Sequence, residues 1–259
     1  MSIPAFLINL DRSQDRLRYM QAQADRIGLQ VERFPAINGS AVPDHLRSQF
    51  AGSRLTPGQV GCYASHLCLH ERVVRDDLSY ALILEDDAEL QDDLMLAAEK
   101  AMAAAPADWD YIQLSGTFKR PVLSIANLPN GRHLVRHWRL PGGTGAYLIS
   151  RRGAEKMIAP GPRVRPVDLE IRYAWLRDLD VLGVYPAPVI CNVQFNTTII
   201  PEARSKSTHS PGLISEVKGK VYRVRKLGLA GTALCVLAAL RMRARRRRTG
   251  EIILITRTP

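Results

Sequence analysis

A run of carboxylates at the end of a short apolar segment constrains this chain more than any other feature. Residues 80–84 have the pattern of a buried strand, and Glu85, Asp86 and Asp87 follow immediately. Three adjacent anions repel one another, so a folded protein keeps them together where a cation binds. Oxygen ligands at this density suit Mg²⁺ or Mn²⁺, which also bind phosphates. The run therefore predicts a metal-assisted nucleotide-diphosphate site at a strand end, where functional loops commonly lie.

An ordinary surface turn is the alternative interpretation of the same run. Carboxylates favour the N-terminus of a helix, where they interact with the helix dipole, and an acidic helix over 87–93 could begin here. In that case the three side chains would be solvated and would bind nothing. The run by itself does not decide between a metal site and a helix start.

The composition indicates a folded α/β protein. The chain has 259 residues, of which 46% are hydrophobic, which excludes a disordered protein and allows one large domain or two small ones. Strand-like segments alternate with helical patterns, so we expect an α/β sandwich with a mostly parallel central sheet. The expected strands are 5–10, 31–34, 81–84, 110–115 and one ending at 150. The expected helices are 13–28, 57–75, one ending near 104, 152–158 and 168–175.

The net charge of +11 is concentrated in one segment. Eleven Lys and Arg and no acidic residue fall between Lys218 and Arg248, whereas residues 1–217 carry no net charge. The basic total therefore says nothing about what the main domain binds. We expect that domain at residues 1–217 and a basic, apolar tail at 218–259.

The tail combines its basic residues with a mostly apolar stretch from Leu227 to Leu240. As a helix this stretch would be about 21 Å long, and it is shorter than the ~20 residues that cross a bilayer. We therefore expect a peripheral anchor on an anionic membrane surface through residues 218–248. A nucleic-acid-binding segment is one alternative, which the lack of interleaved aromatic residues disfavours. A short core helix with solvated flanks is the other.

The cysteines and the first residues favour a cytoplasmic protein. Four cysteines without CxxC spacing indicate reduced packing residues rather than disulfides or zinc ligands. The N-terminus does not resemble a signal peptide, since Pro4 and the polar residues from Asn9 onward interrupt the apolar run. With the basic tail, these features predict a protein that is peripheral on the inner face of the membrane.

Six short motifs, each weak by itself, occur in an order that resembles glycosyltransferase family 25, the lipooligosaccharide galactosyltransferases and their relatives. The resemblance extends from about Ile8 to Asn196 and strengthens the metal interpretation of the acidic run. The motifs are Ile8-Asn-Leu-Asp-Arg12 with Asp15-Arg16, Ala36-Ile-Asn-Gly39, Gly61-Cys-Tyr-Ala-Ser65-His66, Leu84-Glu-Asp-Asp-Ala88, Gly143-Thr-Gly-Ala-Tyr-Leu-Ile-Ser150 and Val167-Asp168.

The resemblance implies a GT-A-like, nucleotide-sugar-binding fold with a UDP-sugar against the acidic strand end. It implies that Glu85 and Asp87 hold Mn²⁺ or Mg²⁺ across the donor's diphosphate, where a cation stabilises the leaving group. Alternate residues of an extended segment point to one side, so these two side chains can converge. Asp86 then faces the other way, toward the ribose or the sugar, and we include it with the catalytic residues.

Further donor contacts are implied at the other motifs. The first strand end would line the uridine and phosphate pocket, and the glycines near 143 would let the backbone approach the sugar. The implied donor-binding residues are Asn9, Arg12, Arg16, Asn38, Gly39, Ser65, His66, Gly143 and Thr144. Structural roles remain the alternative for Arg16, as a surface charge at a helix start, and for His66, as a half-buried histidine.

Other interpretations of these motifs are weaker. His66 and His70 are spaced as in some zinc sites, but Leu67 stands where a metalloprotease has its glutamate. The glycines at 142–145 precede a strand rather than follow one, which excludes a dinucleotide-binding motif. At Asp168 the resemblance implies a general base that takes the proton of the acceptor hydroxyl, and an N-cap is the alternative.

These features predict an enzyme that transfers a hexose, galactose or glucose, from a UDP-sugar to a saccharide or glycolipid acceptor. The expected setting is the biosynthesis of lipopolysaccharide, lipooligosaccharide or another cell-surface glycan. Inversion at the anomeric carbon is implied by the resemblance alone. A non-catalytic nucleotide-sugar-binding protein and a nucleic-acid-binding protein, acting through the Arg-rich tail, are the alternatives.

Overall fold

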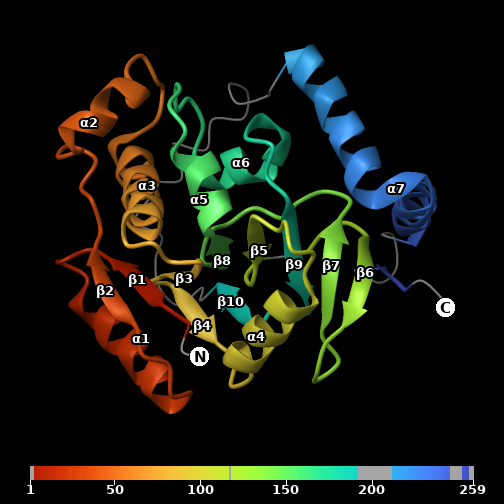
Figure 1. Cartoon of the computed structure of the whole chain (residues 1–259), viewed down its shortest axis with the longest axis horizontal. Helices are drawn as coiled ribbons and strands as arrows, with labels where there is room; N and C mark the ends of the chain where they lie inside the picture. The colour runs from red at the N-terminus through yellow and green to blue at the C-terminus, as the bar shows by residue number, and fades with distance from the viewer. Residues whose placement is uncertain (1–2, 117, 192–211, 246–252, 257–259) are drawn as a thin grey trace.

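A nine-stranded mixed sheet forms the centre of the molecule (Figure 1). The computed structural model describes residues 3–116, 118–191, 212–245 and 253–256. The order of the strands is β11-β6-β7-β9-β5-β8-β3-β1-β2, and β7 and β8 run opposite to the other seven. The sheet strands are β1 (Ala5–Asn9), β2 (Glu32–Pro35), β3 (Tyr80–Glu85), β5 (Tyr111–Gln113), β6 (Val122–Asn127), β7 (His133–His137), β8 (Ala146–Ser150), β9 (Val181–Tyr185) and β11 (Leu254–Ile255).

Helices cover both faces of the sheet, as an α/β sandwich requires (Figure 1). They are α1 (Gln14–Arg26), α2 (Asp44–Arg47), α3 (Pro57–Arg75), α4 (Leu94–Ala104), α5 (Arg151–Ile158), α6 (Val167–Arg172) and α7 (Gly212–Arg245), with short 3₁₀ turns at Ser48–Phe50 and Ala174–Leu176. Strand β1 shows how the layers form. Phe6 and Ile8 pack in the cluster that contains α3, and Ala5 and Leu7 pack in the cluster that contains α1. The predicted mostly parallel α/β sheet is confirmed.

Strand β3 places the carboxylates at the edge of this core. It pairs parallel with β1 and antiparallel with β8, so Glu85 lies beside Ile8 at the strand ends. After the turn at Asp86 and Asp87, the chain forms the short strand β4 (Ala88–Leu90), which pairs with β10 (Val189–Cys191). The alternative of an acidic helix over 87–93 is therefore wrong, because α4 begins only at Leu94.

Helix α3 begins as its sequence predicts. Thr56 is the N-cap, its hydroxyl accepts from the Gln59 amide, the Gln59 side chain accepts from the Thr56 amide, and Pro57 is the first helical residue. Ser13 likewise precedes α1, but its side chain makes no capping hydrogen bond. The β6–β7 hairpin occupies a stretch around Pro129 for which the sequence predicts no regular element.

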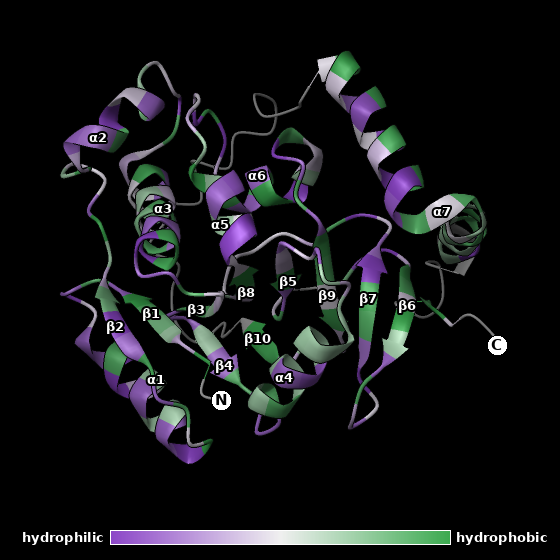
Figure 2. Cartoon of the chain, viewed as in Figure 1, coloured by the Kyte–Doolittle hydropathy of each residue, from purple (hydrophilic) through white to green (hydrophobic). Residues whose placement is uncertain are grey.

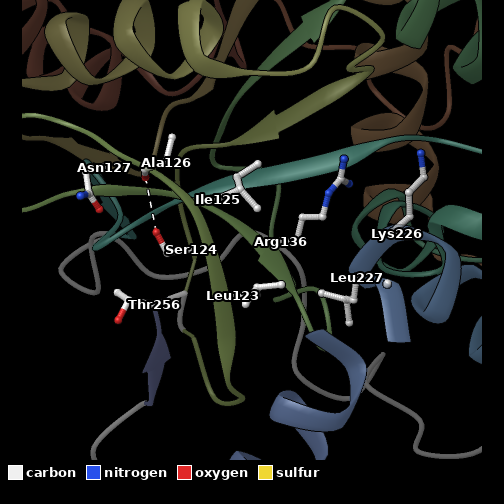
Figure 3. A pocket seen from close by; sticks show the side chains of 10 residues that line it. Leu123, Ser124, Ile125, Ala126, Asn127, Arg136, Lys226, Leu227 and Thr256 are labelled. Atoms are coloured by element: carbon white, nitrogen blue, oxygen red, sulfur yellow. Dashed lines mark hydrogen bonds between the residues drawn. The ribbon is translucent and has the colours of Figure 1, made fainter. Parts of the chain in front are cut away.

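Helix α7 contains the first part of the predicted tail, so the expected boundary at 217/218 falls inside a helix. The helix bends at Gly228, whose φ of 72° is left-handed, and it contacts the turn Ala174–Leu176, β6 and β11 (Figure 1). Leu227 and Cys235 are buried with Leu123, beside a surface hollow of about 560 Å³ (Figure 3).

Hydrophobic residues dominate the central strands, whereas the first arm of α7 shows alternating hydrophobic and hydrophilic bands (Figure 2). No helix in the described ranges is both long enough and apolar enough to span a membrane. The predicted arginine cluster from 241 to 248 lies partly outside the described residues.

Candidate functional site

A pocket of about 330 Å³ opens where β1 and β3 end, which is the usual ligand position in sheets of this kind. Four segments that are distant in the sequence form it: the end of β1 with the start of α1, the loop 36–39, the first half of α3, and the end of β3 with the turn after it. The predicted site residues among its lining are Arg12, Arg16, Asn38, Gly39, Ser65, His66, Glu85, Asp86 and Asp87. Four of the six sequence motifs therefore meet in one cavity, whereas the motifs at 143–150 and 167–168 do not line it.

Close contact between the loop 36–39 and α3 shapes one wall of the pocket. A Cβ on Gly39 would lie 1.7 Å from the carbonyl oxygen of Pro57, and one on Gly61 would lie 2.4 Å from that of Ile37. Both positions therefore require glycine. The Ser65 hydroxyl accepts from the Ile37 amide at 2.8 Å and donates to the Gly61 carbonyl at 2.8 Å. Ser65 thus fixes the wall rather than presenting a free hydroxyl.

Glu85 is held through one of its two carboxylate oxygens. The Nε2 atom of His66 lies 3.1 Å from Oε1, and the hydroxyl of Thr144 donates to the same oxygen. No described side chain bonds Oε2, so this oxygen keeps its lone pairs for a ligand. Burial alone would raise the pKa of Glu85, but His66 and Thr144 outweigh it and lower that pKa. The carboxylate is therefore ionised at neutral pH.

A buried chain of hydrogen bonds orients His66. Its Nδ1 lies 2.8 Å from the hydroxyl of Tyr147, and Nε2 of His70 lies 2.9 Å from the same hydroxyl. A phenol donates one proton and accepts others, so the bonds to Glu85 fix the order. His70 donates to Tyr147, Tyr147 donates to Nδ1 of His66, and Nε2 of His66 donates to Glu85.

The second nitrogen of His70 agrees with this direction of the hydrogen bonds. Burial lowers the pKa of His70 well below its usual value, so the ring is neutral, and this order leaves its Nδ1, which has no described partner, as a bare acceptor rather than an unpaired N–H donor. His66 and His70 thus converge on a tyrosine hydroxyl rather than on a shared metal position. His66 is almost completely buried, so the alternative of a half-buried histidine is wrong in degree.

Asp86 faces away from Glu85, as the alternation of side chains predicts. Its Oδ1 accepts from Arg16 Nη1 at 2.9 Å and its Oδ2 from Asn9 Nδ2 at 2.8 Å. The Asn9 amide oxygen in turn accepts from Arg33 Nε at 3.1 Å. Asn9 is buried behind Asp86 and is not among the residues that line the pocket. Asp86 therefore connects the start of α1 to the acidic turn.

Asp87 differs from its neighbours because no described side chain forms an ion pair or a hydrogen bond with it. Burial, together with the charges of Glu85 and Asp86, raises the pKa of Asp87 to about 6. A hard divalent cation would relieve this repulsion, and carboxylate oxygens are the ligands that Mg²⁺ and Mn²⁺ prefer. The donor set of Glu85 and Asp87 therefore fits the predicted metal.

Cys62 is a pocket residue that the sequence interpretation treated as packing. Its sulfur lies within 4.8 Å of ligand atoms of His66 and Glu85, and it is placed one helical turn before His66. That spacing is the signal that could have identified it. Burial, followed by the charges of Glu85 and Asp168, raises the pKa of the Cys62 thiol well above its usual value. The thiol is thus protonated, and the ionised ligands of this pocket are carboxylates.

Asp168 lies on α6, at the side of the acidic cluster that faces Gly142. A Cβ on Gly142 would lie 3.4 Å from Asp168 Oδ2 and 2.6 Å from Arg172 Nη2, so the glycine gives both side chains room. Burial raises the pKa of Asp168, with Arg172 opposing the shift and Glu85 adding to it. The N-cap of α6 is Pro166 and not Asp168, so the capping alternative is wrong.

The glycine-rich segment before β8 contacts the site through protein atoms. Gly143 has a left-handed φ of 104°, and its carbonyl accepts from Gln113 Nε2 at 3.1 Å. Neither Gly143 nor Thr144 is among the residues that line the pocket, and Thr144 acts on it through Glu85. Sequence reasoning did not identify Tyr147 or Gln113, because a tyrosine or glutamine inside a strand pattern carries no signal of its own.

Comparison with known proteins gives one consistent family. The model of "Glycosyltransferase family 25 (LPS biosynthesis protein)" matches residues 2–169. A "Glycosyltransferase 25 family member" of Anopheles gambiae is 29% identical over 186 residues, covering 63% of this chain and 30% of the relative. Human "Procollagen galactosyltransferase 2" is 28% identical, covering 63% and 29%. The mouse "Inactive glycosyltransferase 25 family member 3" is 28% identical over 217 residues, covering 70% and 35%. This chain thus spans about a third of the length of these relatives.

Proposed function

This chain belongs to glycosyltransferase family 25, and we propose that it transfers a hexose, galactose or glucose, from a UDP-sugar to a saccharide acceptor. The proposal includes a GT-A-like donor domain and inversion at the anomeric carbon. The acceptor would be a lipopolysaccharide, a lipooligosaccharide or another cell-surface glycan. One observation carries the proposal: residues of four separate motifs line a single pocket that contains an unpaired, half-buried carboxylate.

Glu85 and Asp87 would hold Mn²⁺ or Mg²⁺, with Glu85 offering Oε2. When bound, such an ion stabilises the charge that develops on a diphosphate leaving group. Arg12 and Arg16 line the same pocket, where guanidinium groups suit phosphate oxygens. Asp86 would act through others, because its two oxygens orient Asn9 and Arg16. Asn38 and Gly39 would line the nucleoside side.

Asp168 would be the general base. Its carboxylate lies beside Gly142, its raised pKa favours accepting a proton, and the charge of Glu85 contributes to that shift. In this role Asp168 takes the proton of the attacking hydroxyl as the bond to the anomeric carbon forms and the bond to the diphosphate breaks. The wall made by the loop 36–39 and α3 closes one side of the pocket.

Calorimetry with UDP and Mn²⁺ tests the donor site. We expect the unchanged protein to bind UDP much more tightly with Mn²⁺ than without it, and Asp87→Ala to lose this dependence. Glu89→Ala is the matched control, because Glu89 is exposed on the neighbouring strand β4. Unchanged metal-dependent affinity in Asp87→Ala would contradict the metal assignment.

Turnover tests the base. Asp168→Asn should keep UDP affinity but lose about 10²–10⁴-fold in turnover with an acceptor that the unchanged protein glycosylates. Parallel loss of UDP binding would move Asp168 to the donor site. The mouse relative named as inactive makes a non-catalytic nucleotide-sugar-binding protein the second candidate. That candidate would bind UDP-sugar with Mn²⁺ but release no UDP on any glycan acceptor.

The tail would hold the protein on an anionic membrane surface, on the cytoplasmic side. The second arm of α7 exposes apolar side chains, with Leu229 80%, Leu237 53% and Leu240 54% exposed, and basic residues flank them. We expect the full chain to co-sediment with vesicles that contain anionic lipid, and binding to weaken as salt rises. Equal binding to neutral vesicles, or none at low salt, would contradict this anchor.

A further inference from the structure

A second cavity, of about 590 Å³, lies between α7 and the edge formed by β7 and the turn Ala174–Leu176. We propose that this cavity binds the acceptor as an anionic saccharide, one that carries a carboxylate or phosphate substituent. The proposal rests on the proposed function, because it assigns the acceptor side of the same reaction. The lining side chains used below are Arg139, Arg172, Lys220, Arg223, Trp138 and Trp175.

An excess of basic over acidic side chains is the first observation. The cavity is lined by four arginines and a lysine but by one carboxylate, Glu216. Among the described residues, Arg139, Lys220 and Arg223 form no ion pair. Burial and the nearby charge of Arg139 lower the pKa of Arg223, with Glu216 opposing that shift. The guanidinium groups of the half-buried Arg223 and the exposed Arg139 thus repel each other, and an oxyanion would relieve that repulsion.

The hollow beside Leu227 provides a comparison, because its basic side chains are paired within the protein (Figure 3). It is of similar volume and is lined by two cations, Arg136 and Lys226. Arg136 lies 2.6 Å and Lys226 3.0 Å from Oδ1 of Asp180, so both cations form an ion pair within the protein. Excess positive charge therefore distinguishes the second cavity from a neighbouring hollow of the same fold.

Aromatic rings supply the saccharide part of the proposal. The Arg223 guanidinium lies 5.5 Å from the ring centroid of Trp138 and 6.0 Å from that of Trp175. Both indoles line the cavity, where their apolar faces can pack against the C–H face of a sugar ring while the arginines bind its charged substituent. A free inorganic anion would use the charges but not the rings.

Arg172 connects this cavity to the reacting centre. It lines the cavity, and its Nη2 and Oδ2 of Asp168 both lie close to Gly142. The Nε of Arg172 is buried and has no hydrogen-bond partner among the described atoms. An anionic group bound here would satisfy that donor and would place a neighbouring sugar hydroxyl near Asp168. Helix α7, predicted as an anchor alone, then also forms a wall of the acceptor site.

The test is titration of the full chain with trigalacturonic acid, with maltotriose as the neutral saccharide and inorganic phosphate as the charge alone. Calorimetry gives affinity, and tryptophan fluorescence reports on Trp138 and Trp175. We expect the acidic trisaccharide to bind more tightly than either control. Arg139→Gln and Arg223→Gln should each weaken it at least tenfold, and Trp138→Leu should weaken it without changing phosphate binding.

Arg225→Gln is the matched control, because it removes the same charge from α7 at a residue that pairs with Asp178 outside the cavity. Its affinity for the trisaccharide should be unchanged. If Arg223→Gln fails to fold, the exposed Lys220 replaces it as Lys220→Gln. Equal weakening by Arg225→Gln, equal affinity for maltotriose, or phosphate binding as tight as the trisaccharide would each overturn the proposal. Binding to anionic vesicles without binding to the trisaccharide would overturn it too.

Binding of UDP with Mn²⁺, measured in the same variants, separates this proposal from the donor assignment. It should stay unchanged in all of them, because none of these residues lines the donor pocket. If UDP does not bind but the trisaccharide result holds, the donor assignment fails and the anion site stands. If UDP binds normally and the trisaccharide does not, the acceptor proposal fails alone.

Discussion

Two groups of carboxylates in this protein differ in how completely their oxygens are paired with donors and cations. On one side of the fold, Asp110 accepts from Arg152 Nε at 2.7 Å, from Lys156 Nζ at 2.6 Å and from the Asp180 amide at 2.6 Å. Asp180 pairs with Arg136 and Lys226. At the donor pocket, Asp86 pairs with Arg16 and Glu85 is bonded by His66 and Thr144, whereas no described side chain bonds Asp87.

The difference shows how a structural carboxylate is distinguished from one kept for a ligand. A desolvated charge without a partner is costly, and the fold pairs Asp110 and Asp180 fully but leaves Asp87 unpaired. A bound cation would complete the pairing there. The two groups therefore differ in the pairing of their carboxylates as well as in burial, which is complete for Asp110 and Asp180 and partial for Asp87.

The largest expected effect is a loss of stability on removing Asp110, one of the two fully paired carboxylates. Asp110→Ala leaves Arg152, Lys156 and the Asp180 amide without their acceptor, and we expect it to lower the free energy of unfolding by about 3–5 kcal/mol. Chemical denaturation measures this. Asp108→Ala, an exposed position two residues away, should change it by less than ~0.5 kcal/mol. A loss below about 1 kcal/mol in Asp110→Ala would break the comparison.

The contrast also explains what the sequence could predict. Strand β3 and the position of Glu85 at its end follow from an apolar run of five residues, and α3 follows from its capping box. Both signals are local, and the sheet preserves them. The meeting of nine predicted residues in one pocket could be expected only because their motifs resemble a family, since no spacing in the chain encodes it.

Features that depend on distant partners could not be predicted. Tyr147 is an ordinary aromatic residue of a strand until β8 pairs with β3 and brings its hydroxyl to His66 and His70. The tail is similar: its basic and apolar composition indicates a membrane surface, but Tyr222 donates to the Leu179 carbonyl and Lys226 pairs with Asp180. Composition cannot show that a helix has such partners.

A smaller effect, a gain of stability rather than a loss, is expected on replacing the unpaired Asp87. The pKa of Asp87 is raised from 3.8 to about 6, so the folded state binds its proton more tightly than the unfolded state does. The contribution of Asp87 to the free energy of unfolding is therefore present in full below pH ~4, and it is lost as the pH rises through 6. Without metal, Asp87→Asn should therefore be more stable than the unchanged protein by about 2–3 kcal/mol at pH 7.5, and equal to it at pH 4.

Thermal and chemical denaturation in the presence of a chelator at the two pH values measure this gain. The same variant should lose the stabilisation that Mn²⁺ with UDP gives the unchanged protein. Asp180 behaves in the opposite way. Burial would raise the pKa of Asp180, but Arg136 and Lys226 outweigh it and lower that pKa, so its contribution is lost as pH falls. If Asp87→Asn instead lowers the free energy of unfolding at pH 7.5, Asp87 has a structural partner like those of Asp110 and Asp180, and the prediction is wrong.

The smallest expected effect concerns Glu85. This carboxylate is intermediate between the two groups, because one of its oxygens is paired and the other is not. Tyr147→Phe removes the hydroxyl that joins His70 to His66, so Nδ1 of His66 loses its donor. We expect a loss of about 1–2 kcal/mol in stability and a weaker affinity for Mn²⁺ with UDP, by about tenfold or more, as for other residues that orient a ligand. In ¹⁵N NMR spectra of the unchanged protein, His66 should carry its proton on Nε2, and in Tyr147→Phe this preference should weaken.

Tyr111→Phe is the matched control for that experiment. The Tyr111 ring stacks on Tyr147 with centroids 4.5 Å apart, and it is equally buried, but its hydroxyl has no partner among the described atoms. Removing an unsatisfied buried hydroxyl costs little or stabilises, so this variant should keep both its stability and its His66 tautomer. If the two variants lose Mn²⁺ affinity equally, the tyrosines act through packing alone. If only Tyr147→Phe loses it, the hydrogen-bond chain holds the metal-binding oxygen of Glu85 in place.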